Sequence, residues 1–487
     1  MSSMGAVSAK KEGDISDSFA SLSGLDPEPL PDRFRQLKLS LVRGRETQIT
    51  RSWEKLLARL REENDVVARE GPAVIPEVQF SNLDADLARL KDTIHKRGAA
   101  VVKGVIPEAE ARAYKAEIEE YVRQNPSTRG FPASNPQVFE LYWSAPQMKA
   151  RLHPNFMRVQ KTLMRSLWHS SEPSALVSLS QPLIYADRLR IRQPGDAVFA
   201  LGPHQDGGSL ERWEADGYGR GGVYDAVFEG GWERYDPWDV AGRVDAVTNL
   251  YDGLGACSMF RAFQGWLSMS RSGPYQGTLL VNPLLQLSTA YSLLRPFFRP
   301  VRELGPETPG PGTAERAEFL DPGNWVFMGG DAMTSDIPGA SAGHGMEFPA
   351  FRLHPHLELD RTMVHVPEVK PGDFVIWHCD TIHAVDQVHK GTGDSSVLYI
   401  SVCPLTEQNA QYVASQRSAF REGTPAPDFP GGKGESEHIG RPTEEYVRAH
   451  ADLAGLRAFG LERLAEDEAE NSGAADVIRR ANAILGF

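Results

Sequence analysis

Two residues near the middle of the chain have the types and spacing of metal ligands. His204 and Asp206 are separated by one residue in the run Gly202-Pro-His-Gln-Asp-Gly-Gly208. In an extended segment this spacing places both side chains on one side of the chain. The proline before them and the two glycines after them predict an exposed turn at a strand end, where a ligand can enter from solvent. An imidazole and a carboxylate at such a turn can hold one face of a divalent metal ion.

A later segment offers the third ligand. Phe374–Trp377 is predicted to be a buried strand from its aromatic and β-branched content. His378 and His383 follow it, and we assign His383 as the ligand because it lies beyond the strand end. His378 is a candidate for a supporting hydrogen bond. His204, Asp206 and His383 together form the 2-His-1-carboxylate triad of non-haem Fe(II) oxygenases, which leaves one face of the metal open.

Two further patterns look like sites, but we assign them ordinary roles. Residues 217–222 match the pattern GxGxxG, yet no predicted strand precedes them and no amphipathic helix follows, so we reject a nucleotide site. Several later histidines share no regular ligand spacing with a nearby carboxylate. They are expected to be core or surface residues: His344, His354, His356 and His365.

Four stretches of the sequence resemble the DUF1479 family of the Fe(II)/2-oxoglutarate-dependent dioxygenase superfamily, in its fungal-type form. The likeness covers most of residues 75–430. It is carried by these segments: His204-Gln-Asp-Gly-Gly-Ser-Leu-Glu-Arg-Trp213; Gly277-Thr-Leu-Leu-Val-Asn-Pro283 with Leu294-Arg-Pro-Phe-Phe298; Pro371-Gly-Asp-Phe-Val-Ile-Trp-His-Cys-Asp-Thr-Ile-His-Ala-Val385; and Ser395-Ser-Val-Leu-Tyr-Ile400. The resemblance implies an α+β fold with a double-stranded β-helix (jelly-roll, cupin-like) core and flanking helices. It also implies Fe(II), 2-oxoglutarate as cosubstrate, and O2.

One feature common in that superfamily is missing from this chain. Many members carry an arginine or lysine a short way beyond the distal histidine, where it pairs with the far carboxylate of 2-oxoglutarate. Residues 392–400 contain no cation. Arg188, Arg190 and Arg192 instead alternate with apolar residues, as in a strand with one cationic face. Guanidinium groups bind carboxylates in a bidentate manner, so we expect this face to supply the anchor.

Among these arginines we favour Arg192, because it is nearest to the metal turn. A solvated strand edge is the alternative explanation for the three arginines. Two further cations lie in a later predicted helix: Arg417 and Arg421.

Composition limits the classes of partner and compartment. The chain has 487 residues and a formal net charge of −13, which argues against nucleic acid or an anionic membrane as a partner. Its three cysteines are scattered and lack CxxC spacing, so a reducing, cytoplasmic compartment is favoured over a disulfide framework. The N-terminus lacks the apolar stretch of a secretory signal, and no run is long and apolar enough for a membrane span.

The elements that must position the candidate ligands divide into four parts. Residues 1–25 are predicted to be a disordered tail and residues 26–74 a helical segment. Residues 75–440 form the dioxygenase core, with insertions at 209–263 and 303–345. Residues 441–487 are predicted helices that pack on the core or on a partner subunit, which leaves a homo-oligomer open. The first insertion follows the metal turn directly, so a lid, an interface and a peripheral decoration are the alternatives for it.

These observations predict an Fe(II)/2-oxoglutarate-dependent oxygenase that oxidises a small carboxylate-bearing substrate. The resemblance adds an amino acid such as valine, in secondary metabolism, as a direction for the substrate. Hydroxylation, desaturation and oxidative ring closure all remain open as outcomes. Two alternatives are a metal-dependent cupin-type oxygenase or isomerase that does not use 2-oxoglutarate, and a non-enzymatic interaction protein stabilised by its metal.

Overall fold

Two β-sheets form the centre of the molecule. The computed structural model describes residues 10–23, 28–254 and 256–487. The larger sheet has eight strands, in the order β1 (Glu77–Gln79), β2 (Ala99–Lys103), β14 (Phe374–His378), β8 (Phe263–Ser268), β16 (Ser395–Tyr399), β6 (Leu189–Arg192), β4 (Val138–Phe139) and β3 (Gly130–Phe131). The smaller sheet has five strands, in the order β12 (Met346–Glu347), β7 (His204–Gln205), β15 (His383–Val385), β9 (Leu279–Val281) and β13 (Val364–His365).

Neighbouring strands in these sheets are antiparallel, except that β1 pairs with β2 in parallel. Two small ribbons accompany them: β10 (Phe298–Pro300) with β11 (Trp325–Phe327), and β17 (Cys403–Thr406) with β5 (Val177–Leu183). The predicted strand at residues 374–377 is confirmed as β14. Each residue of β14 is buried, as expected for a strand covered on both faces. The chain is therefore a mixed α/β protein with large, mainly antiparallel sheets.

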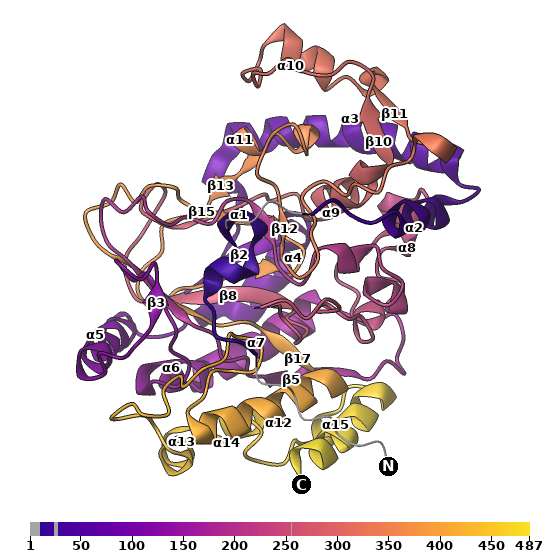
Figure 1. Ribbon diagram of the computed structural model, residues 1–487. Helices are drawn as coiled ribbons and strands as arrows, with labels where there is room; N and C mark the ends of the chain where they lie inside the picture. The colour runs from indigo at the N-terminus through magenta and orange to yellow at the C-terminus, as the bar shows by residue number, and fades with distance from the viewer. Residues whose placement is uncertain (1–9, 24–27, 255) are drawn as a thin grey trace.

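Helices cover the sheets, and both the N-terminal and the C-terminal regions of the chain are mainly helical (Figure 1). The longer ones are α2 (Arg33–Val42), α3 (Glu46–Glu70), α4 (Leu83–Arg97), α5 (Glu108–Gln124), α6 (Ala145–Arg151), α7 (Pro154–Leu167), α9 (Leu285–Leu294), α12 (Glu407–Glu422), α13 (Glu444–His450), α14 (Leu453–Ala458) and α15 (Ser472–Leu485). α3 packs against α9 and the short helix α11 (Leu359–Thr362) at the top of Figure 1, while α12 packs against α15 at the bottom. No helix in the described ranges is long and apolar enough to cross a membrane.

The expected disordered tail is wrong for residues 10–23. They form the 3-10 turn η1 (Ile15–Ser18) and the short helix α1 (Ala20–Ser23), and both Ile15 and Phe19 are buried. Asp14 caps the turn, and its own amide is bonded in return by Asp17. The prediction of disorder rested on the average composition of the tail, which gave no weight to these two apolar residues. The rest of the predicted tail, residues 1–9 and 24–25, lies outside the described residues.

The two insertions differ in how they relate to the sheets. The first contains short turns and the helix α8 (Asp225–Phe228), held by buried aromatic side chains. The second carries α10 (Ala314–Phe319), which stands away from the sheets at the top of Figure 1. Its end, at residues 343–345, returns to the centre of the molecule and lines the main cavity.

Candidate metal centre

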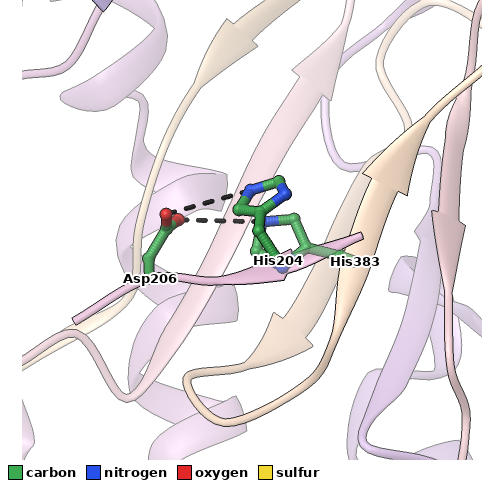
Figure 2. A group of neighbouring side chains, drawn as sticks. All are labelled: His204, Asp206 and His383. Carbon is green, nitrogen blue, oxygen red and sulfur yellow. Dashed lines mark ion pairs between the residues drawn. The ribbon is translucent and has the colours of Figure 1, made fainter. Parts of the chain in front are cut away.

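Strand pairing brings the two candidate histidine ligands together. β7 and β15 are antiparallel neighbours, and His204 lies directly opposite His383 in their register. The two ring centroids are 4.1 Å apart. Asp206 follows β7, and its carboxylate oxygens lie 3.9 Å from His204 Nε2 and 3.6 Å from His383 Nε2 (Figure 2). The candidate ligand atoms of all three residues lie within 4.8 Å of one another, close enough to bind one ion between them.

Backbone carbonyls fix the orientation of both imidazole rings. His204 Nδ1 lies 2.7 Å from the carbonyl oxygen of Gly202, and His383 Nδ1 lies 3.0 Å from that of Thr381. A carbonyl can only accept, so each Nδ1 carries a proton, and each Nε2 is the nitrogen that faces Asp206. This is the arrangement that a metal-binding histidine requires.

The protonation states of His383 and Asp206 also suit a metal ligand. Burial, and then the neighbouring His204, lower the pKa of His383 to about 3, so this ring is neutral near pH 7. Burial opposes the ionisation of Asp206, but the two histidines and Arg261 outweigh it and lower the pKa of the carboxyl. Neutral imidazoles and an ionised carboxylate are the protonation states in which these groups bind metals. The donor set therefore fits a divalent ion such as Fe(II).

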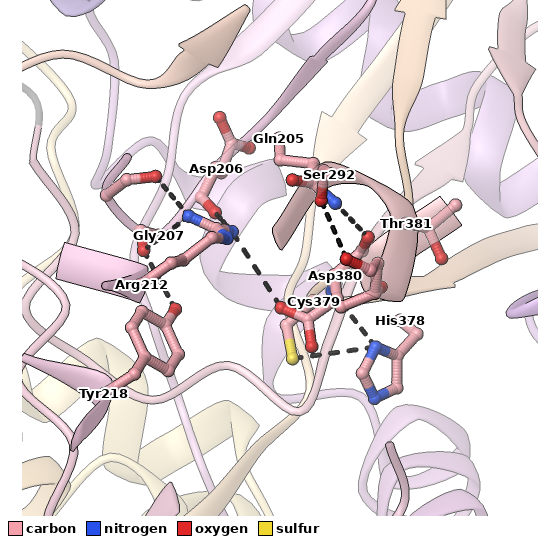
Figure 3. Close-up of polar contacts among 12 residues, drawn as sticks. Gln205, Asp206, Gly207, Arg212, Tyr218, Ser292, His378, Cys379, Asp380 and Thr381 are labelled. Carbon is pink, nitrogen blue, oxygen red and sulfur yellow. Dashed lines mark hydrogen bonds and ion pairs between the residues drawn. The ribbon is translucent and has the colours of Figure 1, made fainter. Parts of the chain in front are cut away.

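The loop that carries Asp206 is held from behind by Arg212. Gly207 and Gly208 have φ of +77° and +81°, a region that other residues rarely adopt. The Arg212 guanidinium donates to the carbonyl of Asp206 at 2.9 Å and also to that of Gly208 (Figure 3). The Tyr218 hydroxyl donates to the carbonyl of Gly207 at 2.9 Å. These bonds fix the backbone of the turn, and so the position from which the carboxylate extends.

A buried carboxylate ties the same insertion to the segment that holds His383. Asp380 is fully buried, and Tyr224 and Tyr235 donate to its two oxygens at 2.9 Å and 3.0 Å. Arg243 donates to it at 2.5 Å, and Arg212 lies 3.8 Å away. All four partners belong to the insertion at 209–263. These contacts describe a fixed support behind the site, and they do not favour the lid among the three alternatives.

A further bond joins the two ligand-bearing segments directly. Gln205, between the first two candidate ligands, donates its side-chain amide to the carbonyl of Asp380 at 2.5 Å. Asp380 is three residues before His383. The metal turn and the distal histidine therefore share one buried polar network, so that a change at Arg212 or Asp380 should alter the metal geometry.

The three candidate ligands line a cavity of about 180 Å³ between the two sheets. Strands of both sheets contribute side chains to its wall. They include Arg190 of β6, Trp266 of β8, Val397 of β16, Leu279 of β9 and Val385 of β15. The cavity is large enough for small organic molecules next to the metal position. Its wall also includes the apolar residues Val138 and Phe199, and the guanidinium of Arg190 lies over the Phe199 ring, 5.2 Å from its centroid.

Arg192, the favoured anchor, is already engaged elsewhere. Its side chain is fully buried and is absent from the cavity wall in the described residues. Its Nε donates to Asp196 at 2.6 Å, and its terminal nitrogens donate to the carbonyls of Asp196, Asp386 and Gln387. A guanidinium with these partners has little capacity left for another carboxylate. The structure therefore does not favour Arg192 as the anchor for 2-oxoglutarate.

Arg188 and Arg190 do line the cavity, but their partners differ. Arg188 lies 3.4 Å from a carboxylate oxygen of Glu140 and 3.6 Å from one of Asp187, so its charge is compensated. Arg190 donates to the side-chain oxygen of Gln137 and to the carbonyl of Phe199, both of which are neutral. Within the described ranges Arg190 has no ion pair, and burial lowers its pKa. A buried cation of this kind is expected to bind an anion.

Arg261 is a cavity residue that the sequence did not single out. It lies just before β8, and its guanidinium is 3.8 Å from the carboxylate of Asp206, with 11% of the side chain exposed. The described part of the chain offers it no hydrogen bond, although Tyr185 packs against it at 5.4 Å. Arg261 thus faces the metal position with free donors. No periodicity marks it in the sequence, since only the fold brings it next to Asp206.

The remaining candidates have structural roles. His378 accepts from the amide of Asp380 at 3.0 Å and lies 2.9 Å from the carbonyl of Pro237, so it supports the network without contacting the candidate ligands. Arg417 and Arg421 bind the C-terminal helices, through the carbonyl of Leu485 and the carboxylate of Glu444 respectively. The histidine set at 344–365 forms no metal-binding group among the described residues.

Replacing Arg212 by lysine should weaken metal binding. A single ammonium cannot bond several loop carbonyls and face Asp380 at the same time, so the turn that carries Asp206 should loosen. We expect Arg212→Lys to lower the affinity for Fe(II), titrated anaerobically, roughly 10- to 100-fold, as is typical of residues that support metal ligands. Arg220→Lys is the matched control, because Arg220 lies in the same insertion and is exposed, 3.8 Å from Asp216. Equal metal affinities in both variants would contradict this role.

The comparisons with known proteins agree on one family. The Gig2-like family model matches residues 28–461. The uncharacterized protein YbiU of Escherichia coli K12 is 31% identical over 422 residues, which covers 84% of this chain and 90% of YbiU. The crystal structure of GlcNAc Inducible Gene 2, GIG2 (DUF1479), from Candida albicans has a TM-score of 0.79 and 31% identity over 95% of this chain and 97% of that one. The E. coli hypothetical protein JW0805 has a TM-score of 0.71 and 29% identity over 90% and 99%. The chain belongs to the Gig2-like (DUF1479) family.

Proposed function

We propose that this protein is an Fe(II)- and 2-oxoglutarate-dependent oxygenase that oxidises a small carboxylate-bearing substrate. One observation carries the proposal. Two imidazoles and a carboxylate converge from β7 and β15 on the wall of a cavity that also presents two arginines. Arg190 has no ion pair in the described ranges, and the carboxylate next to Arg261 is that of the candidate ligand Asp206. A metal triad with one open face, next to free cations, suits a reaction between two small organic acids at the metal.

The fold proposed for this core is a double-stranded β-helix. The two antiparallel sheets both contribute residues to the same cavity, which supports two faces of one curved barrel. His204 and Asp206 then come from one strand end and His383 from its neighbour, all in the smaller sheet. In this arrangement the metal lies inside the barrel, where the sheets exclude bulk water.

Each part of the site has a separate role in the proposed reaction. Fe(II) held by His204, Asp206 and His383 would, together with 2-oxoglutarate, supply the O2 activation needed to oxidise an unactivated C–H bond. The protein side chains orient the reactants and exclude water. The Nδ1–H groups of both rings stay hydrogen-bonded to the carbonyl oxygens of Gly202 and Thr381, so that both rings act as ligands and not as acids.

We assign the far carboxylate of 2-oxoglutarate to Arg190. β6 pairs with β16, and Arg190 lies opposite Val397 in that register. β16 belongs to the stretch after the distal histidine, which contains no cation. The neighbouring strand β6 therefore supplies the cation, at the position opposite Val397. We assign the carboxylate of the substrate to Arg261, because this cavity residue lies 3.8 Å from the carboxylate of the metal ligand Asp206. A small amino acid such as valine has one carboxylate, which could bind Arg261, and a short aliphatic chain.

The principal alternative is a metal-dependent oxygenase or isomerase that does not use 2-oxoglutarate. The absence of a cation at residues 392–400 favours it. Release of succinate from 2-oxoglutarate in the presence of candidate substrates separates the two functions. Arg190 favours the 2-oxoglutarate-dependent reaction, because a single substrate carboxylate bound at Arg261 would leave the buried Arg190 without an anion.

The ligand assignment predicts that three single substitutions abolish metal binding. His204→Ala, Asp206→Ala and His383→Ala should each lower Fe(II) affinity by more than the roughly 10- to 100-fold that follows loss of a supporting residue. Circular dichroism should show that the fold is retained. His344→Ala is the control, because His344 lines the same cavity without belonging to the triad. Retained metal binding in His383→Ala, with loss in His378→Ala, would show that the distal ligand is misassigned.

The two arginine assignments predict that Arg190→Leu weakens the binding of 2-oxoglutarate and that Arg261→Leu weakens the binding of the substrate. Arg190→Leu should raise the concentration of 2-oxoglutarate needed for half-maximal binding more than about tenfold, or about 1.4 kcal/mol. Arg261→Leu should leave this value within a few fold and weaken substrate binding instead. Arg190→Lys should recover part of the loss. Isothermal titration of the Mn(II)-loaded protein measures both without turnover, and an unchanged 2-oxoglutarate affinity in Arg190→Leu would refute the anchor.

A further inference from the structure

An N-terminal segment forms part of the cavity wall. We call residues 10–23 the N-terminal strap; Ile15, Ser18 and Phe19 within it line the cavity. Phe19 is 5% exposed, and its ring meets the ring of the candidate ligand His204 edge to face, with centroids 4.9 Å apart. In Figure 1 the indigo strap rises from the side of the C-terminal helices to α1, near β12. The match to the Gig2-like family model begins at residue 28, after the strap.

Polar contacts hold the strap across segments that are distant in the sequence. Lys10 donates to the carbonyls of Gly253 and Asp428, both at 3.2 Å. The amide of Gly345 donates to the carbonyl of Ser18 at 3.1 Å. Ser21 donates its amide to the carboxylate of Glu347, the last residue of β12, at 3.0 Å. The strap is thus fixed to both insertions and to the loop that follows α12.

The strap adds apolar surface to a cavity whose wall carries both arginines and other apolar side chains. Ile15 joins Val138 and Phe199 in a small buried cluster of its own. Phe19 completes this side next to the metal position. The arginines lie on β6 and before β8. The side chains of Ile15 and Phe19 offer no hydrogen-bond donor, so a substrate whose carboxylate binds an arginine would place its apolar part against them. A polar group at that place would lose its hydrogen bonds to water without replacement.

We propose that Ile15 and Phe19 determine substrate specificity, by packing against an aliphatic chain of the substrate beside the metal. This inference rests on the proposed function and narrows its substrate class to small aliphatic acids. The size of the side chain at position 19 sets how much space is left for the substrate beside His204.

The test compares strap variants of the full-length protein loaded with Mn(II) and 2-oxoglutarate. Alanine, valine, leucine and phenylalanine are titrated as probes by calorimetry. Phe19→Ala and Ile15→Ala should shift the preference between small and large amino acids toward the larger ones by about tenfold or more, as expected when a pocket changes by several methylene groups. Leu22→Ala is the matched control, because Leu22 is an apolar strap residue that does not line the cavity. It should keep the order of preference of the unchanged protein.

A second measurement needs neither metal nor 2-oxoglutarate. Cys257 lines the cavity, whereas Cys403 is buried outside it. Phe19→Ala should speed the alkylation of Cys257 by iodoacetamide at least about fivefold relative to Cys403, followed by mass spectrometry, and Leu22→Ala should not.

The outcomes separate this inference from the function on which it rests. An unchanged order of amino acids in both strap variants overturns the inference, even if Cys257 becomes more accessible. Unchanged labelling of Cys257 also overturns it, since the strap would then not close the cavity. Failure of the unchanged protein to bind 2-oxoglutarate would refute the proposed function first, and the specificity role with it.

Discussion

The pairing of β7 with β15 is the constraint on which the site depends. His204 faces His383 across these two strands, and a shift of one residue would turn one imidazole to the opposite face. Short strands define their register weakly on their own, and β7 has only two residues. The polar network behind these strands fixes their register. Gln205 binds the segment before His383, and Arg212 binds the turn after His204 while facing Asp380.

The buried charged side chains of this molecule fall into two kinds. Some are paired with protein groups and hold the structure together, and others are left to bind a ligand. Asp380 is matched by Arg243 and two tyrosine hydroxyls, so its charge is satisfied inside the protein. Arg192 is likewise matched by Asp196. On the cavity wall, Arg190 has no ion pair in the described ranges, and Arg261 faces only the candidate metal ligand Asp206, at 3.8 Å. Buried ions of the first kind hold the fold together, and those of the second kind favour anionic ligands.

Local patterns in the sequence were sufficient to nominate the three residues that the structure brings together. The one-residue spacing of His204 and Asp206, and a histidine just beyond a buried strand, depend only on extended backbone geometry. The anchor was different. Alternation along 188–192 indicates one face of a strand, but it cannot show that Arg192 is taken by Asp196 in the next turn. Arg261 carries no local signal at all, because its position near Asp206 arises from strands far apart in the chain.

The N-terminal strap shows a signal that composition obscured. Ile15, Phe19 and Leu22 recur at helical spacing, in a stretch otherwise poor in apolar residues. Average composition predicted disorder there, whereas this periodicity marks the residues that pack on the core. The folding of short segments is decided by the few side chains that find a buried partner.

Visible absorption spectroscopy of the anaerobic Fe(II) protein tests the central claim most directly. A 2-oxo acid that binds Fe(II) through its keto and carboxylate groups produces a weak charge-transfer absorption, whereas succinate, which lacks the keto group, produces none. We expect this absorption to appear when 2-oxoglutarate is added to the unchanged protein, to be absent with succinate, and to be absent from Asp206→Ala. An Fe(II)-loaded protein that shows no such absorption at saturating 2-oxoglutarate would contradict the account.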